Sequence, residues 1–185
     1  MTENVLSAIR DVPDFPSPGI VFKDIGPLLR DPVAYAATVD ALAAAASGAV
    51  PGSTAGDPGF DLVVGIEARG FLFGAPLALR TGTGFVPVRK AGKLPGQTVS
   101  TSYSLEYGQA TIEIQDDAIR AGDRVLVVDD VLATGGTVAA SVDLVRRCGG
   151  TVVGVVVLME LGFLDGAAAL RTAGYSGPLV SLQTV

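Results

Sequence analysis

Apolar residues along the chain gather into short runs separated by segments of helical pattern. The runs at 61–66, 83–89, 124–130 and 151–160 are almost continuously apolar and rich in valine, as in TVVGVVVLME. Continuous runs of this kind are typical of strands buried on both faces of a parallel sheet. The segment ATIEIQ (110–115) instead alternates between apolar and polar residues, as a half-exposed strand does.

Three further segments have the composition and boundaries of helices. Residues 31–47 are rich in alanine, with Asp31 in the N-cap position and Pro32 at the first helical position. Residues 70–80 and 137–149 each follow a predicted strand. Buried strands that alternate with helices predict an α/β fold with a mostly parallel central sheet flanked by helices. In such sheets, ligands bind beyond the carboxyl ends of the strands.

The remaining segments predict connections within one domain. Residues 47–60 (SGAVPGSTAGDPGF) are too short for a second domain, and we assign them no role. Residues 90–109 are polar and rich in Gly, Ser and Thr, which predicts a mobile loop. The full length of 185 residues suits one domain with a complete hydrophobic core.

Composition narrows the chemistry that is possible. The net charge of -6 disfavours a protein that coats nucleic acid but leaves room for a local basic pocket. Histidine is absent, which removes Ser-His-Asp and Cys-His catalysis and His-based zinc sites. The single cysteine, Cys148, excludes an internal disulfide and is expected to pack near a helix end. With no apolar run long enough to span a bilayer and no signal-peptide core, we expect a cytoplasmic protein without a membrane partner.

The stretch VLVVDDVLATGGT (125–137) carries the strongest chemical signal. A Gly-rich turn before a helix lets backbone N–H groups approach a phosphate, and we expect a side chain at Gly135 or Gly136 to take the phosphate's place. Asp129 and Asp130 can accept hydrogen bonds from vicinal hydroxyls or approach a magnesium ion. Together these features predict a ribose 5-phosphate site. A solvated acidic turn and a magnesium site like that of response regulators are the alternatives.

The same stretch closely resembles the phosphoribosyl pyrophosphate motif of the type I phosphoribosyltransferases. Further segments resemble the members of that family that use adenine, in the same order and over nearly the whole chain: IRDVPDFPSPGIVFKDIGPLL (9–29), GIEARGFLFGAPLA (65–78), VRKAGKLPG (88–96), YSLEYG (103–108) and VVVLMELGFLDG (155–166). The resemblance implies a single domain over 1–185, with a base-binding hood at 1–30 and a flexible catalytic loop at 90–109. It also implies magnesium-dependent synthesis of AMP and pyrophosphate from adenine and phosphoribosyl pyrophosphate, in purine salvage, by a homodimer.

The resemblance assigns the sugar and phosphate groups to particular residues. It places Asp129 and Asp130 on the ribose hydroxyls, with the 5-phosphate surrounded by Ala133, Thr134, Gly135, Gly136 and Thr137. Arg69 follows a buried strand and is implied to bind pyrophosphate and to assist catalysis; a surface pair with Glu67 is the alternative. A local basic cluster is expected to meet the same anion, or else to form a solvated edge: Arg89, Lys90 and Lys93.

The base and the proton transfer are assigned in the same way. The resemblance implies that the purine lies against Leu161 and against the segment Val21, Phe22 and Lys23, although many members have Arg at the position of Lys23. It implies that Glu106 is the catalytic carboxyl group and that Tyr107 lines the substrate. Magnesium is expected to be held by substrate phosphates and water, with Asp129 and Asp130 acting at most through water.

Two other functions remain open at this point. A phosphoribosyltransferase for a 6-oxopurine would differ only in how the site reads position 6 of the base. A regulator that senses phosphoribosyl pyrophosphate and binds nucleic acid would need a helix-turn-helix segment or a basic stripe, and the sequence has neither.

Overall fold

The computed structural model describes residues 7–104 and 109–185. The chain forms two compact units, one ending at Ala41 and one running from Leu42 to Val185. In the first unit, β1 (Arg10–Pro13) and β2 (Val21–Asp24) form an antiparallel hairpin, and α2 (Gly26–Arg30) follows. Helix α3 (Pro32–Ala49) begins where the sequence predicts, because Asp31 Oδ1 accepts hydrogen bonds from the N–H groups of Val33 and Ala34 at 2.9 and 3.1 Å.

In the second unit, seven strands of the described residues form one sheet in the order β5-β6-β4-β3-β7-β8-β9. Strands β4, β3, β7, β8 and β9 are parallel to one another. Strand β6 pairs antiparallel with both β4 and β5. The mostly parallel sheet predicted from the sequence is therefore confirmed. The strands are β3 (Leu62–Ile66), β4 (Gly84–Lys90), β5 (Thr98–Ser104), β6 (Gln109–Gln115), β7 (Arg124–Leu132), β8 (Thr151–Glu160) and β9 (Leu179–Thr184).

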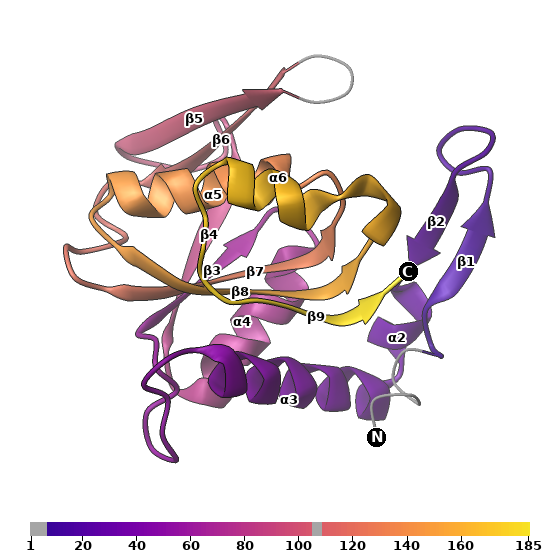
Figure 1. Ribbon diagram of the computed structural model, residues 1–185, viewed down its shortest axis with the longest axis horizontal. Helices are drawn as coiled ribbons and strands as arrows, with labels where there is room; N and C mark the ends of the chain where they lie inside the picture. The colour runs from indigo at the N-terminus through magenta and orange to yellow at the C-terminus, as the bar shows by residue number, and fades with distance from the viewer. Residues whose placement is uncertain (1–6, 105–108) are drawn as a thin grey trace. The chain divides into compact units, whose positions relative to one another are not determined.

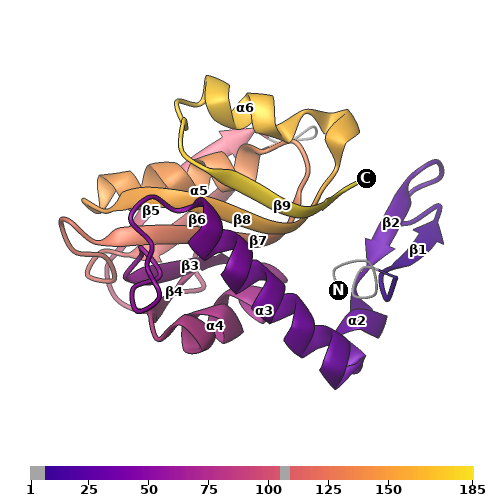
Figure 2. The same cartoon turned by 60° about the horizontal axis from the view of Figure 1, so that its bottom comes forward.

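Helices cover both faces of this sheet. Helix α4 (Gly70–Thr81) lies on one face, and α5 (Gly136–Arg147) and α6 (Gly166–Thr172) lie on the other, as Figure 1 and the turned view in Figure 2 show. A short 3₁₀ turn, η1 (Gly162–Leu164), joins β8 to α6. The carboxyl ends of β3, β7 and β8 point to the same edge because these strands are parallel. The loops that follow them therefore meet at one edge of the sheet.

The central strands are buried as the apolar runs predict. Residues 125–128 of β7 and 155–159 of β8 are each no more than 1% exposed. Phe73 and Leu77 from α4, and Leu144 and Val145 from α5, complete the core on the two faces. Each such side chain contributes about 1.5–3 kcal/mol by leaving water, so this core is the scaffold that fixes the strand ends.

Several elements of the second unit differ from the sequence prediction. Strand β5 occupies residues 98–104, inside the segment predicted as a loop, because these residues pair with β6 along their whole length. Strand β7 does not end at the two aspartates but continues to Leu132, paired with β8. The elements α6 and β9 were not predicted.

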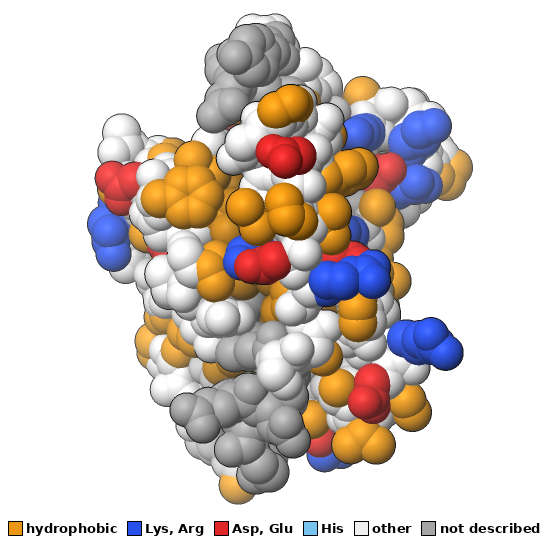
Figure 3. All heavy atoms as spheres, turned by 90° about the vertical axis from the view of Figure 1, so that its right-hand side faces the viewer, with side chains coloured by type: hydrophobic (Ala, Val, Ile, Leu, Met, Phe, Trp, Pro, Cys, Tyr) orange, Lys and Arg blue, Asp and Glu red, His pale blue; other side chains and the backbone are white. Residues whose placement is uncertain are grey.

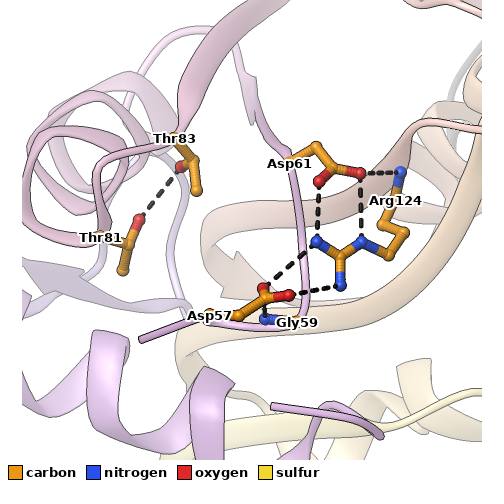
Figure 4. Close-up of polar contacts among 6 residues, drawn as sticks. All are labelled: Asp57, Gly59, Asp61, Thr81, Thr83 and Arg124. Atoms are coloured by element: carbon orange, nitrogen blue, oxygen red, sulfur yellow. Dashed lines mark hydrogen bonds and ion pairs between the residues drawn. The ribbon is translucent and has the colours of Figure 1, made fainter. Parts of the chain in front are cut away.

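A charged cluster closes the opposite, amino-terminal edge of the sheet. Arg124, the first residue of β7, donates to Asp61 from Nη2 (2.8 Å) and Nε (3.2 Å), and to Asp57 from Nη1 and Nη2 (3.2 Å each), as Figure 4 shows. Asp57 also accepts the N–H of Gly59 at 2.8 Å. These bonds fasten the end of the 47–60 connection to the sheet, and they raise the pKa of Arg124.

Among residues 7–104 and 109–185, none of the helices has the length and apolar character that a bilayer crossing requires.

Candidate active site

The Gly-rich turn lies between the carboxyl end of β7 and the first turn of α5. Gly135 caps the helix with φ +82°, a left-handed conformation that favours glycine. A small pocket of about 60 Å³ lies at this turn, lined by Asp129 and residues 131–138. Because the first N–H groups of a helix have no partner within the helix, this end of α5 offers donors and a positive dipole to an anion. The turn therefore offers donors to an anion, and its role as the 5-phosphate site stays a prediction.

The reason for glycine at position 135 differs from the prediction. A Cβ at Gly135 would stand 2.6 Å from the carbonyl oxygen of Gly166 and 3.0 Å from Leu170 Cδ1, both of α6. It would thus press on α6 and not occupy the phosphate's place, so the expectation for Gly135 is corrected. A Cβ at Gly166 would overlap the carbonyl oxygen of Ala133. The two glycines let the turn and α6 pack backbone against backbone, and Gly166 was missed because its partner is about thirty residues away in the chain.

The two aspartates lie on β7 in different surroundings. Asp129 is partly exposed, and its Oδ1 accepts the N–H of Asp130 at 2.9 Å. Asp130 is buried, and its Oδ2 has no hydrogen bond but lies 2.9 Å from Arg69 Nε. Burial, together with the charge of Asp130, raises the pKa of Asp129 well above its ordinary value. Burial also raises the pKa of Asp130, although the charge of Arg69 opposes the rise. Asp130 Oδ2 therefore remains able to accept a hydrogen bond from a ligand.

Arg69 ends the loop that joins β3 to α4. Its Nε lies 2.9 Å from Asp130 Oδ2 of β7, whereas Glu67 forms an ion pair with Arg89. The arginine side chain remains 41% exposed, so it keeps surface for a ligand. Gly70 follows at the start of α4, where a Cβ would stand 2.8 Å from Asp129 Oδ1 and 3.0 Å from the Val128 carbonyl oxygen. Only glycine lets the loop approach the acidic pair so closely, and this residue was missed in the sequence.

Two carboxylates, neither assigned a site role from the sequence, organise the basic cluster that follows β4. Glu67 Oε2 accepts a hydrogen bond from Arg89 Nε at 3.1 Å and from the N–H of Lys90 at 2.9 Å. Arg89 Nη1 donates in turn to the carbonyl oxygen of Lys93 at 3.0 Å. Burial alone would raise the pKa of Glu67, but these donors hold it below its ordinary value.

Glu113, on β6, holds the backbone of the loop that carries Lys93. Its carboxylate is buried and accepts the N–H groups of Lys93 (3.0 Å) and Leu94 (3.1 Å) and the hydroxyl of Thr98 (3.4 Å). Burial alone would raise the pKa of Glu113, but the backbone N–H donors of this loop lower it. This role could not be predicted from the sequence, because Glu113 lies in an alternating strand about twenty residues from Lys93 and Leu94.

The remaining predicted residues fall into three groups. Leu161 follows β8 and is partly exposed, and its N–H donates to the carbonyl oxygen of Leu132 at 2.9 Å, which places it beside the end of β7. Val21, Phe22 and Lys23 lie on β2 of the N-terminal unit, where Phe22 packs edge-on against Phe15 with ring centroids 5.1 Å apart and Lys23 Nζ binds Asp11 at 2.7 Å. Glu106 and Tyr107 lie outside the described residues.

The larger unit combines an α/β fold with a helix-capping glycine turn, an acidic pair and a basic cluster. This combination is typical of enzymes that act on nucleotides or sugar phosphates. The family model described as "Phosphoribosyl transferase domain" matches residues 35–169. The chain therefore belongs to the phosphoribosyltransferase family, and the resemblance seen in the sequence is confirmed.

Its relatives narrow the comparison further. The chain is 60% identical to an adenine phosphoribosyltransferase of Streptomyces coelicolor over 185 residues, which is 100% of this chain and 97% of the relative. Among solved structures, it resembles the adenine phosphoribosyltransferase of Thermoanaerobacter pseudethanolicus with TM-score 0.89 and 48% identity, covering 100% of both chains. It also resembles the Saccharomyces cerevisiae enzyme in complex with an imino-altritol bisphosphate and adenine, with TM-score 0.88 and 41% identity, covering 98% of this chain and 97% of the other.

Proposed function

We propose that this chain transfers the 5-phosphoribosyl group of phosphoribosyl pyrophosphate to adenine, producing AMP and pyrophosphate in purine salvage. This is the activity of a pentosyltransferase. The observation that carries the proposal is the arrangement at the end of β7, where a phosphate-sized turn follows two aspartates on the same strand. The full-length similarity to adenine phosphoribosyltransferases at 60% identity supports adenine as the base.

The site residues divide the substrate between them. The turn from Ala133 to Thr137 holds the 5-phosphate through backbone N–H groups and the start of α5. Asp129 and Asp130 accept hydrogen bonds from the ribose hydroxyls, which supplies the hydrogen bond that the buried Asp130 Oδ2 lacks. Arg69 and the basic cluster of Arg89, Lys90 and Lys93 bind pyrophosphate, with Glu67 and Glu113 fixing their positions.

The base is assigned to the N-terminal hairpin and to Leu161. Phe22 supports the purine ring, and the backbone groups of Val21 and Lys23 read its edge. The partial exposure of Leu161 beside the end of β7 supports its role. The complex of the Saccharomyces cerevisiae relative with adenine supports adenine as the base.

The reaction breaks the bond between the anomeric carbon and a pyrophosphate oxygen, and a ring nitrogen of adenine forms a bond to that carbon. The attacking ring nitrogen of adenine must lose its proton for the base of AMP to be neutral, and Glu106 is the carboxyl group assigned to accept it, an assistance typically worth about 10²–10⁴-fold in rate. Tyr107 lines the substrate beside it. Arg69 stabilises the charge that develops on the departing pyrophosphate.

Magnesium belongs to the proposal as a companion of the substrate. Among the described residues, no group of three or more His, Cys, Asp or Glu side chains converges as a metal site. An ion held by phosphate oxygens and water needs no such group. Asp129 and Asp130 fit a role through water because carboxylate oxygens are hard ligands and Asp130 Oδ2 has no hydrogen bond. When bound, the ion neutralises part of the pyrophosphate charge.

The proposed assembly is a homodimer in the cytoplasm. Leu72 and Leu79 lie seven residues apart, on the same side of α4, and are 39% and 85% exposed. Apolar side chains repeated at this spacing on a surface helix suit a second copy of the chain. Light scattering is expected to give the mass of a dimer, and Leu79→Glu is expected to lower it; a monomer in the unaltered protein would contradict the proposal.

The 6-oxopurine enzyme differs from the proposed enzyme in the base that it uses, and the nucleic-acid-binding regulator differs in the surface charge that it needs. On the face shown in Figure 3, Lys and Arg side chains are interspersed with acidic and hydrophobic ones, which does not favour a nucleic-acid-binding regulator. An enzyme for 6-oxopurines would share the phosphate and ribose site.

One assay separates these functions. The protein is incubated with phosphoribosyl pyrophosphate, magnesium and adenine, hypoxanthine or guanine in turn, and nucleotide formation is followed. AMP from adenine is the expected product. IMP or GMP as the main product would overturn the choice of base, and no nucleotide at all would overturn the enzyme.

A further inference from the structure

A hydrogen bond joins the phosphate turn to the strand that precedes residues 105–108. Thr137 Oγ1 donates to the hydroxyl of Tyr103 at 2.9 Å. Thr137 is the second residue of α5 and lines the small pocket, whereas Tyr103 lies on β5. Both side chains are half-buried, and Tyr103 packs against the core cluster of the sheet. The tyrosine hydroxyl is therefore held beside the wall of the pocket.

Strand β5 is hydrogen-bonded to both ends of α5. Near the other end of the helix, Arg147 Nη1 donates to the carbonyl oxygen of Ser100 at 2.7 Å. Strand β5 is also paired with β6 at every residue from Thr98 to Ser104. Since both ends of α5 are bonded to the same strand, Tyr103 cannot shift far from Thr137 without breaking several contacts.

The direction of this hydrogen bond determines whether Thr137 can donate to an anion in the pocket. A hydroxyl has one hydrogen and two acceptor lone pairs. While Thr137 donates its hydrogen to Tyr103, its oxygen presents only lone pairs to the pocket, and lone pairs repel phosphate oxygens. Thr137 can help to bind a phosphate only if it turns its hydrogen towards the anion. Its oxygen then needs a donor, and Tyr103 is the neighbour that can supply one because a phenol both donates and accepts.

We propose that Tyr103 is a positioning residue for the 5-phosphate of the substrate, acting through Thr137 by reversing the direction of their hydrogen bond. Without ligand, Thr137 donates to Tyr103. With the phosphate bound, Thr137 donates to a phosphate oxygen and Tyr103 donates to Thr137. The two hydroxyl hydrogens rotate in this reversal. The proposal rests on the phosphate site of the proposed function.

The test compares two parts of the substrate separately. Calorimetry with magnesium present measures the affinity for ribose 5-phosphate and for pyrophosphate in the unaltered protein and in Tyr103→Phe. The variant keeps the ring in the core but cannot donate. We expect its affinity for ribose 5-phosphate to fall about 2- to 10-fold, the range expected for one hydrogen bond, while its affinity for pyrophosphate stays the same. Equal losses for both ligands would indicate a general structural effect and overturn the proposal.

A double-mutant cycle tests the route through Thr137. Thr137→Val removes the hydroxyl at nearly constant shape, so adding Tyr103→Phe to it should cause no further loss of ribose 5-phosphate affinity. In Thr137→Ser, which keeps the hydroxyl, Tyr103→Phe should cause the same loss as in the unaltered protein. Additive losses in the Val background would show that Tyr103 does not act through Thr137.

A matched control lies on the same hairpin. The hydroxyls of Ser102 and Thr111 bond to each other at 2.8 Å on the exposed side of β5 and β6. Ser102→Ala removes a hydrogen bond of the hairpin away from the pocket, and it should change neither affinity. If the unaltered protein fails to bind ribose 5-phosphate, the proposed phosphate site fails; if it binds and Tyr103→Phe binds equally well, only the role of Tyr103 fails.

Discussion

The substitution Gly135→Ala is expected to lower the free energy of unfolding by about 2–4 kcal/mol and to weaken phosphate binding. Two separate effects add up to this magnitude. Alanine in the left-handed conformation at φ +82° costs about 1 kcal/mol. The added Cβ stands 2.6 Å from the carbonyl oxygen of Gly166, and overpacking of this kind typically costs about 1–3 kcal/mol.

Two other glycines separate the effects. Gly122 has φ +94° with nothing within 4 Å of its Cβ position, so Gly122→Ala should cost only about 1 kcal/mol and leave ligand binding unchanged. Gly166 has no positive φ, but its Cβ would overlap the carbonyl oxygen of Ala133, so Gly166→Ala should cost about 1–3 kcal/mol and displace the turn.

Urea denaturation measures the stability of the three variants, and calorimetry measures their affinity for ribose 5-phosphate. The expected order of destabilisation is Gly135→Ala above Gly122→Ala, with loss of ribose 5-phosphate affinity only in the variants at 135 and 166. If Gly135→Ala is as stable as Gly122→Ala and binds normally, the close packing of the turn on α6 does not shape the phosphate site.

Three further predictions concern the carboxylates. Asp129→Asn is expected to raise the free energy of unfolding at pH 7 by roughly 1 kcal/mol, because burial and the charge of Asp130 raise the pKa of Asp129 and thus disfavour its charged form. The same variant is expected to bind ribose 5-phosphate more weakly. Urea denaturation and calorimetry measure the two effects, and a less stable variant would contradict the reasoning. Glu113 has a lowered pKa, so its contribution to stability is complete above its ordinary pKa of 4.5 and is lost as the pH falls through the lowered pKa. Glu113→Gln should remove this part of the pH dependence of stability in denaturation curves and weaken pyrophosphate binding severalfold. An unchanged pH dependence would contradict this prediction. Glu106→Gln should slow the single-turnover step by about 10²–10⁴-fold with nearly normal phosphoribosyl pyrophosphate affinity, and an unchanged rate would remove Glu106 from the proton exchange.

The features that could be predicted from sequence are those with a local cause. Continuous valine-rich runs identify β7 and β8 because a strand buried on both faces requires apolar residues at every position. The glycine turn and the capping Asp31 are likewise visible, since their chemistry lies within a few neighbouring residues. Strand β5 was missed because TVSTSYS is polar, and only its pairing with β6 makes it a strand.

The features that could not be predicted depend on partners far apart in the chain. Arg69 binds Asp130, sixty-one residues away, although Glu67 is much nearer in sequence. Glu113 acquires its role only because β6 lies beside the loop of Lys93. What a Cβ at Gly135 would contact depends on Gly166, which lies in α6 about thirty residues further along the chain. Local sequence patterns specify backbone conformation well, but they do not specify which long-range contacts a side chain will make.

The four bonds of Arg124 also have a consequence for protein engineering. They fasten the end of the 47–60 connection at the edge of the sheet opposite the loops of the candidate active site. The exposed bend at Pro51 and Gly52 is therefore joined to the fold on the far side from that site. Doubling the length of a flexible loop costs only about 0.6 kcal/mol in closure entropy. This bend is therefore a suitable place to insert a peptide tag or a reporter domain. The bonds of Arg124 would hold the connection to the sheet and keep movements of the insert from reaching the enzyme.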